Sequence, residues 1–189
     1  MLISHALKEW DLAVRSLAAG KTILLLRKGG IREVGGNFQV KYRTVLLYPT
    51  YEHQKPHLFK PEFVHHITPA PSSWHPETIK ISSWADITDI FAVSSEIIVK
   101  QLLPYHIWSE EFVSDRLKWK PSQPLYLLLL RVYNLAKSVS IPYDVSYSGC
   151  QSWIDILEPM DLTDSIPILD ESEYAKQVNA IYKIINHES

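Results

Sequence analysis

The residues best suited to chemistry lie in two short segments of the first third of the chain. The first segment runs from Arg27 to Arg32 and contains Lys28, Gly29 and Gly30 between its two arginines. Glycine lets the backbone approach a ligand and present N–H groups to an anion, and arginine offers a planar fork for phosphate or carboxylate. We therefore expect a basic hairpin that binds an anion. The alternative is an exposed hairpin whose charges keep an edge strand soluble.

The second segment, from Tyr48 to Gln54, follows a predicted strand and places several polar side chains around a proline. His53 can act as a general base near neutral pH, with Glu52 orienting its ring, and a hydrogen-bonded turn accounts for the same residues equally well. Thr50 and Tyr48 are predicted to line the same cleft. Glu52 and His53 are the catalytic candidates if the protein is an enzyme.

Two further arginines complete the predicted binding set. Arg43 precedes an apolar run and extends the basic hairpin, while Arg131 stands alone within the apolar run 125–135. A buried guanidinium needs an anionic partner or lines a cleft, and we expect Arg131 to line the cleft.

Other motifs point away from nucleotide hydrolysis and from metal binding. The segment from Gly20 to Thr22 resembles a phosphate-binding loop, but the earlier glycine of that motif is replaced by Arg15 and the predicted order of helix and strand is inverted. His53 and His57 have the spacing of two ligands on a helix, which Pro56 makes improbable. The sequence therefore predicts no metal and no cofactor.

The pattern of apolar residues predicts an α+β fold of one domain, residues 1–189. We expect a small curled mixed sheet or partial β-barrel, flanked by N-terminal, middle and C-terminal helices. Six prolines in 49–76 predict a loop-rich surface excursion, and Asp170 with Glu173 predicts a capping box for an amphipathic last helix over 170–187. The predicted helices are 7–17, ended by Gly20, a short helix through residue 103 that Ser94 or Ser95 caps, 109–119 and 170–187. The predicted strands are 21–27, 43–48, 78–84, 125–135 and 150–156; the apolar run 125–135 fits a buried strand or a buried helix, and we expect the strand.

Composition limits the class of protein. The chain has 189 residues, of which 46% are hydrophobic and 21% charged, so it can bury a core. It has no apolar run near the ~20 residues that a membrane-spanning helix needs, and its start does not resemble a secretory signal. A single cysteine, Cys150, cannot form an intrachain disulfide. We therefore expect a cytoplasmic protein with no membrane partner.

The charge is unevenly distributed along the chain. Residues 1–60 contain ten lysines and arginines against four acidic residues, a balance of +6, whereas the remainder has nine against seventeen, a balance of −8. The two sum to the net charge of −2. This asymmetry indicates an anionic partner for the first third, or two halves of one domain with complementary surfaces.

Five segments together resemble domain-of-unknown-function family 1802. This family is found largely in photosynthetic bacteria and has no established biochemical activity, so the resemblance implies kinship and, at most, an association with restriction–modification systems. The segments that carry it are Ala6–Trp10, Leu25–Glu33, Tyr48–Gln54, Leu130–Tyr133 and Gly149–Trp153.

A second similarity is to the ASCH and PUA-like small barrels. It is carried by the predicted first helix, by Gly20 and by the strand that ends at Arg27. Members of these families bind RNA or modified nucleosides, and some hydrolyse small amides. In the positions of the family's lysine and glutamate this chain has Thr22 and Leu25, so the resemblance implies a barrel with a basic mouth rather than amide hydrolysis.

The leading hypothesis is a nucleic-acid-binding module, for RNA or DNA, whose basic hairpin receives phosphate. One alternative is a nuclease or small amide or nucleoside hydrolase that uses His53 with Glu52, and Arg27 as the clamp. The other is a non-catalytic module that binds a protein partner or a second copy of itself through the acidic part and the last helix.

Overall fold

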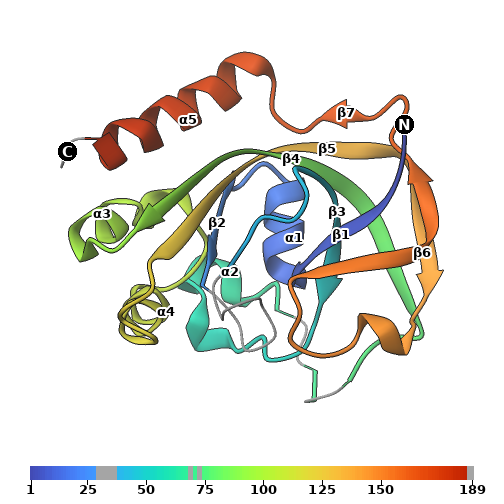
Figure 1. Ribbon diagram of the computed structural model, residues 1–189, viewed down its shortest axis with the longest axis horizontal. Helices are drawn as coiled ribbons and strands as arrows, with labels where there is room; N and C mark the ends of the chain where they lie inside the picture. Colours follow the sequence, from blue (N-terminus) through green and yellow to red (C-terminus); the bar gives the residue numbers. More distant parts are fainter. Residues whose placement is uncertain (29–37, 68–69, 72–73, 187–189) are drawn as a thin grey trace.

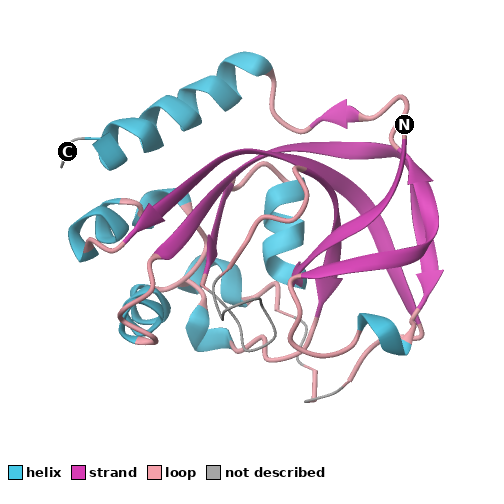
Figure 2. Cartoon of the chain, viewed as in Figure 1, coloured by secondary structure: helices cyan, strands magenta, loops and turns pink. Residues whose placement is uncertain are grey.

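The computed structural model describes residues 1–28, 38–67, 70–71 and 74–186. Helices and strands are partly segregated along this chain (Figures 1 and 2). Within these described residues the connections contain three 3₁₀ turns, η2 (Pro56–Leu58), η3 (Leu103–Tyr105) and η4 (Val145–Tyr147). The strands are β1 (Leu2–Trp10), β2 (Leu24–Arg27), β3 (Thr44–Thr50), β4 (Thr78–Val93), β5 (Leu125–Pro142), β6 (Trp153–Asp161) and β7 (Ile166–Pro167), and the helices are α1 (Asp11–Ala18), α2 (Pro61–Val64), α3 (Glu96–Gln101), α4 (Glu110–Lys118) and α5 (Glu171–Asn186).

The strands form one mixed sheet of seven strands in the order β2-β5-β4-β3-β1-β6, with β7 paired to β5. β1 and β3 are parallel, and the other pairs are antiparallel. The long strands β4 and β5 change register between Ile81 and Ser83 and again between Ile87 and Asp89. Such irregularities bend a strand, and the sheet curls around α1 (Figure 1). The predicted α+β class and curled mixed sheet are confirmed.

Both faces of the central strands are buried. In β3, Val45 and Leu47 belong to one hydrophobic cluster, while Leu46 and Tyr48 belong to a second cluster on the other face. Side chains alternate between the faces of a strand, so a strand covered on both sides becomes a continuous apolar run. This explains why the run at the start of β5, Leu125–Leu130, does not show the alternation of a half-exposed strand.

The start of the chain differs from the prediction. Residues 7–10 belong to strand β1, and the helix begins only at Asp11. Ala6 and Leu7 pack into different clusters, one on each face of the sheet, which only an extended chain allows. The predicted end of the helix is correct: Gly20 has a φ of +67°, its N–H donates to Leu17, and the N–H of the next residue donates to Ser16.

The later helices follow their predicted caps. The hydroxyl of Ser95 accepts a hydrogen bond from the backbone N–H of Ile98 at the start of α3, and Ser109 does the same for Phe112 in α4. The carboxylate of Asp170 accepts from the N–H of Glu173, at 2.8 Å, at the start of α5. In the part of the chain that the structure describes, no helix is long and apolar enough to cross a membrane.

Candidate functional site

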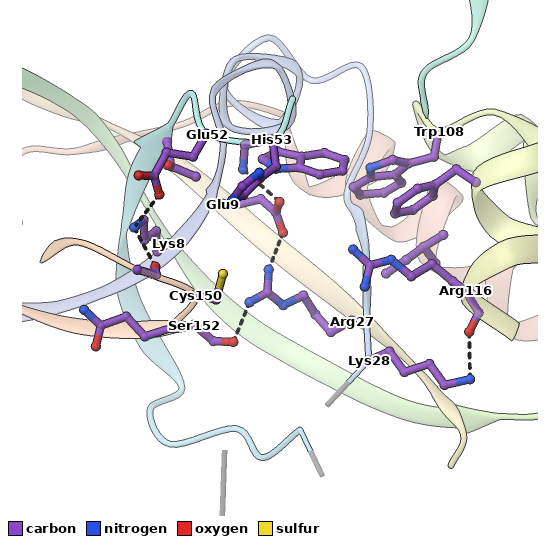
Figure 3. A pocket seen from close by; sticks show the side chains of 16 residues that line it. Lys8, Glu9, Arg27, Lys28, Glu52, His53, Trp108, Arg116, Cys150 and Ser152 are labelled. Atoms are coloured by element: carbon purple, nitrogen blue, oxygen red, sulfur yellow. Dashed lines mark hydrogen bonds and ion pairs between the residues drawn. The ribbon is translucent and has the colours of Figure 1, made fainter. Parts of the chain in front are cut away.

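A cavity of about 240 Å³ opens where the C-terminal ends of β1 and β2 face helix α4 (Figure 3). The turn after β3 and the segment 149–152 before β6 form the rest of its wall. Segments far apart in the sequence therefore supply one lining. The lining residues are Lys8, Glu9, Trp10, Leu26, Arg27, Lys28, Thr50, Glu52, His53, Trp108, Phe112, Arg116, Gly149, Cys150, Gln151 and Ser152.

Arg27 is fixed at the end of β2 by two short contacts. One guanidinium nitrogen donates to Glu9 Oε2 at 2.6 Å, and another donates to Ser152 Oγ at 2.6 Å. The other carboxylate oxygen of Glu9 accepts from the backbone N–H of Trp10 at 2.8 Å. These bonds join β1, β2 and the segment before β6, so Arg27 and Glu9 hold the cavity wall together.

Lys8 also holds part of the cavity wall in place through hydrogen bonds. Its buried ammonium donates to the carbonyl oxygens of Tyr147 and Gly149, at 2.7 and 3.0 Å, and lies 3.8 Å from Glu52 Oε2. Burial lowers the pKa of Lys8, and the nearby carboxylate of Glu52 opposes that shift. The three acceptors use the donors of Lys8, so this side chain anchors the segment that carries Cys150.

Arg116 projects from α4 into the cavity, with its guanidinium carbon 5.0 Å from the centre of the Phe112 ring (Figure 3). Among the residues that the structure describes, Arg116 donates no hydrogen bond from its guanidinium and has no ion-pair partner. Burial lowers the pKa of Arg116, and the like charge of Arg27 lowers it further. Two guanidinium groups thus share one cavity, and of these two only Arg27 forms an ion pair with a carboxylate of the described residues, while the charge of Glu9 partly opposes the lowered pKa of Arg116.

Trp108 adds a second unused donor. The residue is 1% exposed and lines the cavity, and its indole Nε1 is buried with no acceptor in the described part of the chain. Its ring stacks on Phe112 with 5.9 Å between the ring centres. A buried N–H without an acceptor is costly, so the Trp108 indole is a candidate donor to a ligand group that accepts hydrogen bonds.

Lys28 lies at the edge of the cavity and turns toward α4. Its ammonium donates to the carbonyl oxygens of Arg116 and Leu117, at 2.7 and 3.0 Å, in the last turn of the helix. A cation there complements the negative end of the helix dipole. Burial lowers the pKa of Lys28, and so does the charge of Arg116.

The structure brings together five of the residues that the sequence singles out: Arg27, Lys28, Thr50, Glu52 and His53 line one cavity. His53 is exposed and has a φ of 62°, so it occupies a tight turn. The other predictions for this region, Gly29, Gly30 and Arg32, lie outside the described residues.

Three predicted binding residues lie elsewhere. Tyr48 is buried in the second hydrophobic cluster and packs edge-on against Tyr147. Arg43 is exposed and donates to the carbonyl oxygen of Ile87 at 3.0 Å. Arg131 donates to the carbonyl oxygen of Asp170 at 3.1 Å, and it therefore joins the sheet to the start of α5. None of the three lines the cavity, because the strand register turns Tyr48 and Arg131 toward other neighbours.

Sequence reasoning missed the residues that α4 and β1 contribute. The charges of 109–119 follow the pattern of a solvent-exposed helix face, so nothing in the sequence distinguishes Arg116 from its neighbours. Lys8 and Glu9 fall within the predicted helix 7–17, whereas the structure has both buried in strand β1. Within the described ranges, no group of three or more His, Cys, Asp or Glu side chains is placed to hold a metal ion.

Comparison with protein families identifies the kinship of this chain. The model of the family described as "Domain of unknown function (DUF1802)" matches residues 6–180, a range that includes every residue lining the cavity. The chain belongs to the DUF1802 family. The resemblance seen in the sequence is thereby confirmed. A comparison with curated proteins gave no match for this DUF1802 chain.

Solved structures similar to this DUF1802 protein are those of ASCH from Zymomonas mobilis. The crystal structure of that protein is 12% identical, covers 93% of each chain and has a TM-score of 0.44. A serine-to-alanine mutant of it is 13% identical and covers 93% of this chain and 94% of that chain, with a TM-score of 0.44. The expected similarity to ASCH domains is thus also found among solved structures.

Proposed function

We propose that this DUF1802 protein is a cytoplasmic nucleic-acid-binding module that holds a phosphate group in its cavity. The observation that carries the proposal is the guanidinium of Arg116, which enters the cavity beside Arg27 without an acceptor among the described residues. Guanidinium binds phosphate through two parallel hydrogen bonds. A bound phosphate would separate the charges of Arg116 and Arg27 and satisfy the donors of Arg116.

The charge and the aromatic side chains of the cavity support the same ligand. Four cationic side chains and two carboxylates line it, a formal balance of +2. Trp10 and Trp108 stand in the wall beside these charges. Proteins that bind single-stranded nucleic acid combine cationic grooves with aromatic rings on which bases stack. The proposed site joins a cationic lining with the partly buried ring of Trp10.

The proposal is tested by fluorescence anisotropy in reducing buffer without added metal. The probes are short single-stranded RNA, single-stranded DNA and duplex DNA, each phosphorylated at one end and labelled at the other, titrated across a salt series. Wild-type protein should bind with an affinity that falls linearly on a log–log plot against salt. Arg116→Ala should weaken binding of every probe and reduce the slope by about 0.7 to 0.9, the value for one phosphate contact.

A matched control separates this contact from a general effect of charge. Lys137 is exposed on β5 and lies outside the cavity lining, and Lys137→Ala removes the same single charge. This variant should bind like the wild type. The proposal is wrong if no probe binds at low salt, or if Arg116→Ala and Lys137→Ala have equal effects.

A second candidate function is hydrolysis at the same cavity, favoured by the presence of Glu52, His53 and Cys150 in its lining. In this alternative His53 acts as acid or base and Arg27 stabilises developing negative charge. A nuclease of this kind would suit the restriction–modification association that the family resemblance implies. Incubation with labelled RNA and DNA should then give cleavage that His53→Ala abolishes without loss of folding. Full cleavage by His53→Ala would remove this assignment.

A further inference from the structure

We propose that the cavity recognises the end of a nucleic-acid strand, by binding a terminal phosphate monoester in preference to an internal phosphodiester. The inference rests on the proposed function and names the part of the ligand that the cavity holds. It is carried by the number and placement of the unused donors, by the charge of the lining and by the size of the cavity.

The two residues with unused donors both lie against one aromatic ring, that of Phe112. Trp108 stacks on Phe112 with the ring centres 5.9 Å apart, and the Arg116 guanidinium carbon lies 5.0 Å from the centre of Phe112. The Trp108 indole N–H is buried and has no acceptor within the described residues. Together the guanidinium fork and the indole supply three donors. A monoester has three free oxygens that accept hydrogen bonds, whereas an internal diester has two.

The charge of the lining also favours a monoester. The formal balance of the cavity is +2, and the C-terminal end of α4, where Lys28 binds, offsets about half a charge. A phosphate monoester carries a charge of roughly −1.5 to −2 at neutral pH. A diester carries a single negative charge and would leave part of the cationic surplus unneutralised.

The size and shape of the cavity suit one terminal unit. Its volume is about 240 Å³, below the roughly 300–1,000 Å³ of cavities that enclose drug-sized ligands. Strands β1 and β2, helix α4 and the segment 149–152 all contribute to the wall. A terminal nucleotide can enter such a cavity from one side, whereas an internal phosphate needs room for the chain to leave again.

The experiment compares single-stranded RNA and DNA of one sequence in three forms: with a 5′-phosphate, with a 3′-phosphate and with hydroxyl groups at both ends. Wild-type protein should bind at least one phosphorylated form about tenfold more tightly than the hydroxyl form, as expected for one further charge-assisted hydrogen bond. A nucleoside monophosphate should compete with that probe, and the corresponding nucleoside should not.

Two conservative variants test the donors. Arg116→Lys keeps the charge but loses the fork, and Trp108→Phe keeps an aromatic ring but loses the N–H. Each should reduce the preference for the phosphorylated form over the hydroxyl form by severalfold, whereas Lys137→Ala, outside the cavity lining, should leave this preference unchanged. Circular dichroism and thermal unfolding establish that each variant is folded.

The outcomes distinguish this inference from the proposed function. If no oligonucleotide binds, the proposed function fails and this inference fails with it. If all three forms bind equally well to the wild type, the protein binds nucleic acid but does not recognise its ends, and only this inference is overturned. If mononucleotides bind while phosphorylated oligonucleotides do not, the ligand is a free nucleotide, which overturns the assignment to a strand end.

Discussion

Arg27 and Arg116 carry the same charge into one cavity, but their surroundings differ. The side chain of Arg27 is 15% exposed and pairs with Glu9, whose side chain is 8% exposed. Removal of one partner from a buried ion pair leaves a costly lone charge, so Glu9 and Arg27 together maintain the wall. Arg116 rests on the face of Phe112 instead. We infer that Arg27 positions the site and that Arg116 contacts the ligand.

His106 gives the protein a predictable response to acid. Burial lowers the pKa of His106 to about 3, and the positive charge of Lys60 contributes to the shift. Because the unfolded chain binds the proton at a pKa near 6.5, the stability that neutral His106 contributes is complete above pH 6.5. It is lost as the pH falls toward 3, by about 5 kcal/mol.

The measurement is urea unfolding of the wild type and His106→Asn between pH 7 and pH 4. The variant should show a weaker loss of the free energy of unfolding in acid, since it has no group to protonate. His57 is exposed, and His57→Asn should retain the wild-type pH dependence. An unchanged acid response in His106→Asn would show that other groups cause it.

At the scale of single residues, the sequence predicted five of the sixteen residues that line the cavity. Glu52 and His53 could be identified because they follow a strand, and Arg27 because it ends one. Arg116 and Trp108 could not, since their role depends on the packing of α4 against the end of β2 rather than on any local pattern. For Arg131 the prediction of a cleft position is wrong. The arginine stands within an apolar run because it donates a hydrogen bond to Asp170 at the start of α5.

At the scale of elements, the helices with capping residues could be predicted, whereas the junction between β1 and α1 could not. Capping residues identified α3 and α4 correctly, because a cap is a local interaction. β1 was read as a helix because its apolar residues continue into the helical spacing of α1. Only pairing with β3 and β6, distant in sequence, makes residues 2–10 a strand.

The turn after α1 depends on Gly20. Its φ of +67° disfavours side chains, and a Cβ added there would lie 2.9 Å from Leu169 Cδ2. Gly20→Ala should therefore lower the free energy of unfolding by about 1–2 kcal/mol for the backbone conformation, with a further loss from the contact with Leu169. Thermal or urea unfolding measures the total.

A double-mutant cycle separates the two contributions. In the Leu169→Ala background the clash is removed, so Gly20→Ala should cost less than in the wild type. Equal costs in both backgrounds would show that the contact contributes nothing.

At the scale of the whole molecule, the cavity and helix α5 lie at different places on one sheet. The sheet curls around α1 and opens the cavity beside α4, while α5 runs along the outside of the sheet (Figure 1). Among its described residues, α5 contributes none to the cavity lining. The overall class could be predicted from the sequence because apolar runs and turn residues mark the strands, whereas the curl depends on bulges in β4 and β5 that leave no clear signal.

This separation predicts that α5 supports stability without affecting binding. Ile181 is fully buried in the main cluster, and Ile181→Ala should lower the free energy of unfolding by about 2–5 kcal/mol. Lys183 is exposed, and Lys183→Ala should change it by less than about 0.5 kcal/mol. Under conditions where both variants are fully folded, their affinities for phosphorylated RNA should equal that of the wild type. A weakened affinity of folded Ile181→Ala would show that the two parts are coupled.

Contact between ligand phosphate and the unused donors of the cavity can be observed directly. The measurement is an NMR titration of the indole N–H groups with a short 5′- or 3′-phosphorylated oligonucleotide. The Trp108 resonance is identified by its loss in Trp108→Phe, and Trp84, buried in the other hydrophobic cluster, is the internal control. If ligand phosphate meets the Trp108 N–H, the Trp108 resonance should shift progressively while that of Trp84 stays unchanged. Saturation of binding without a shift at Trp108 would contradict it.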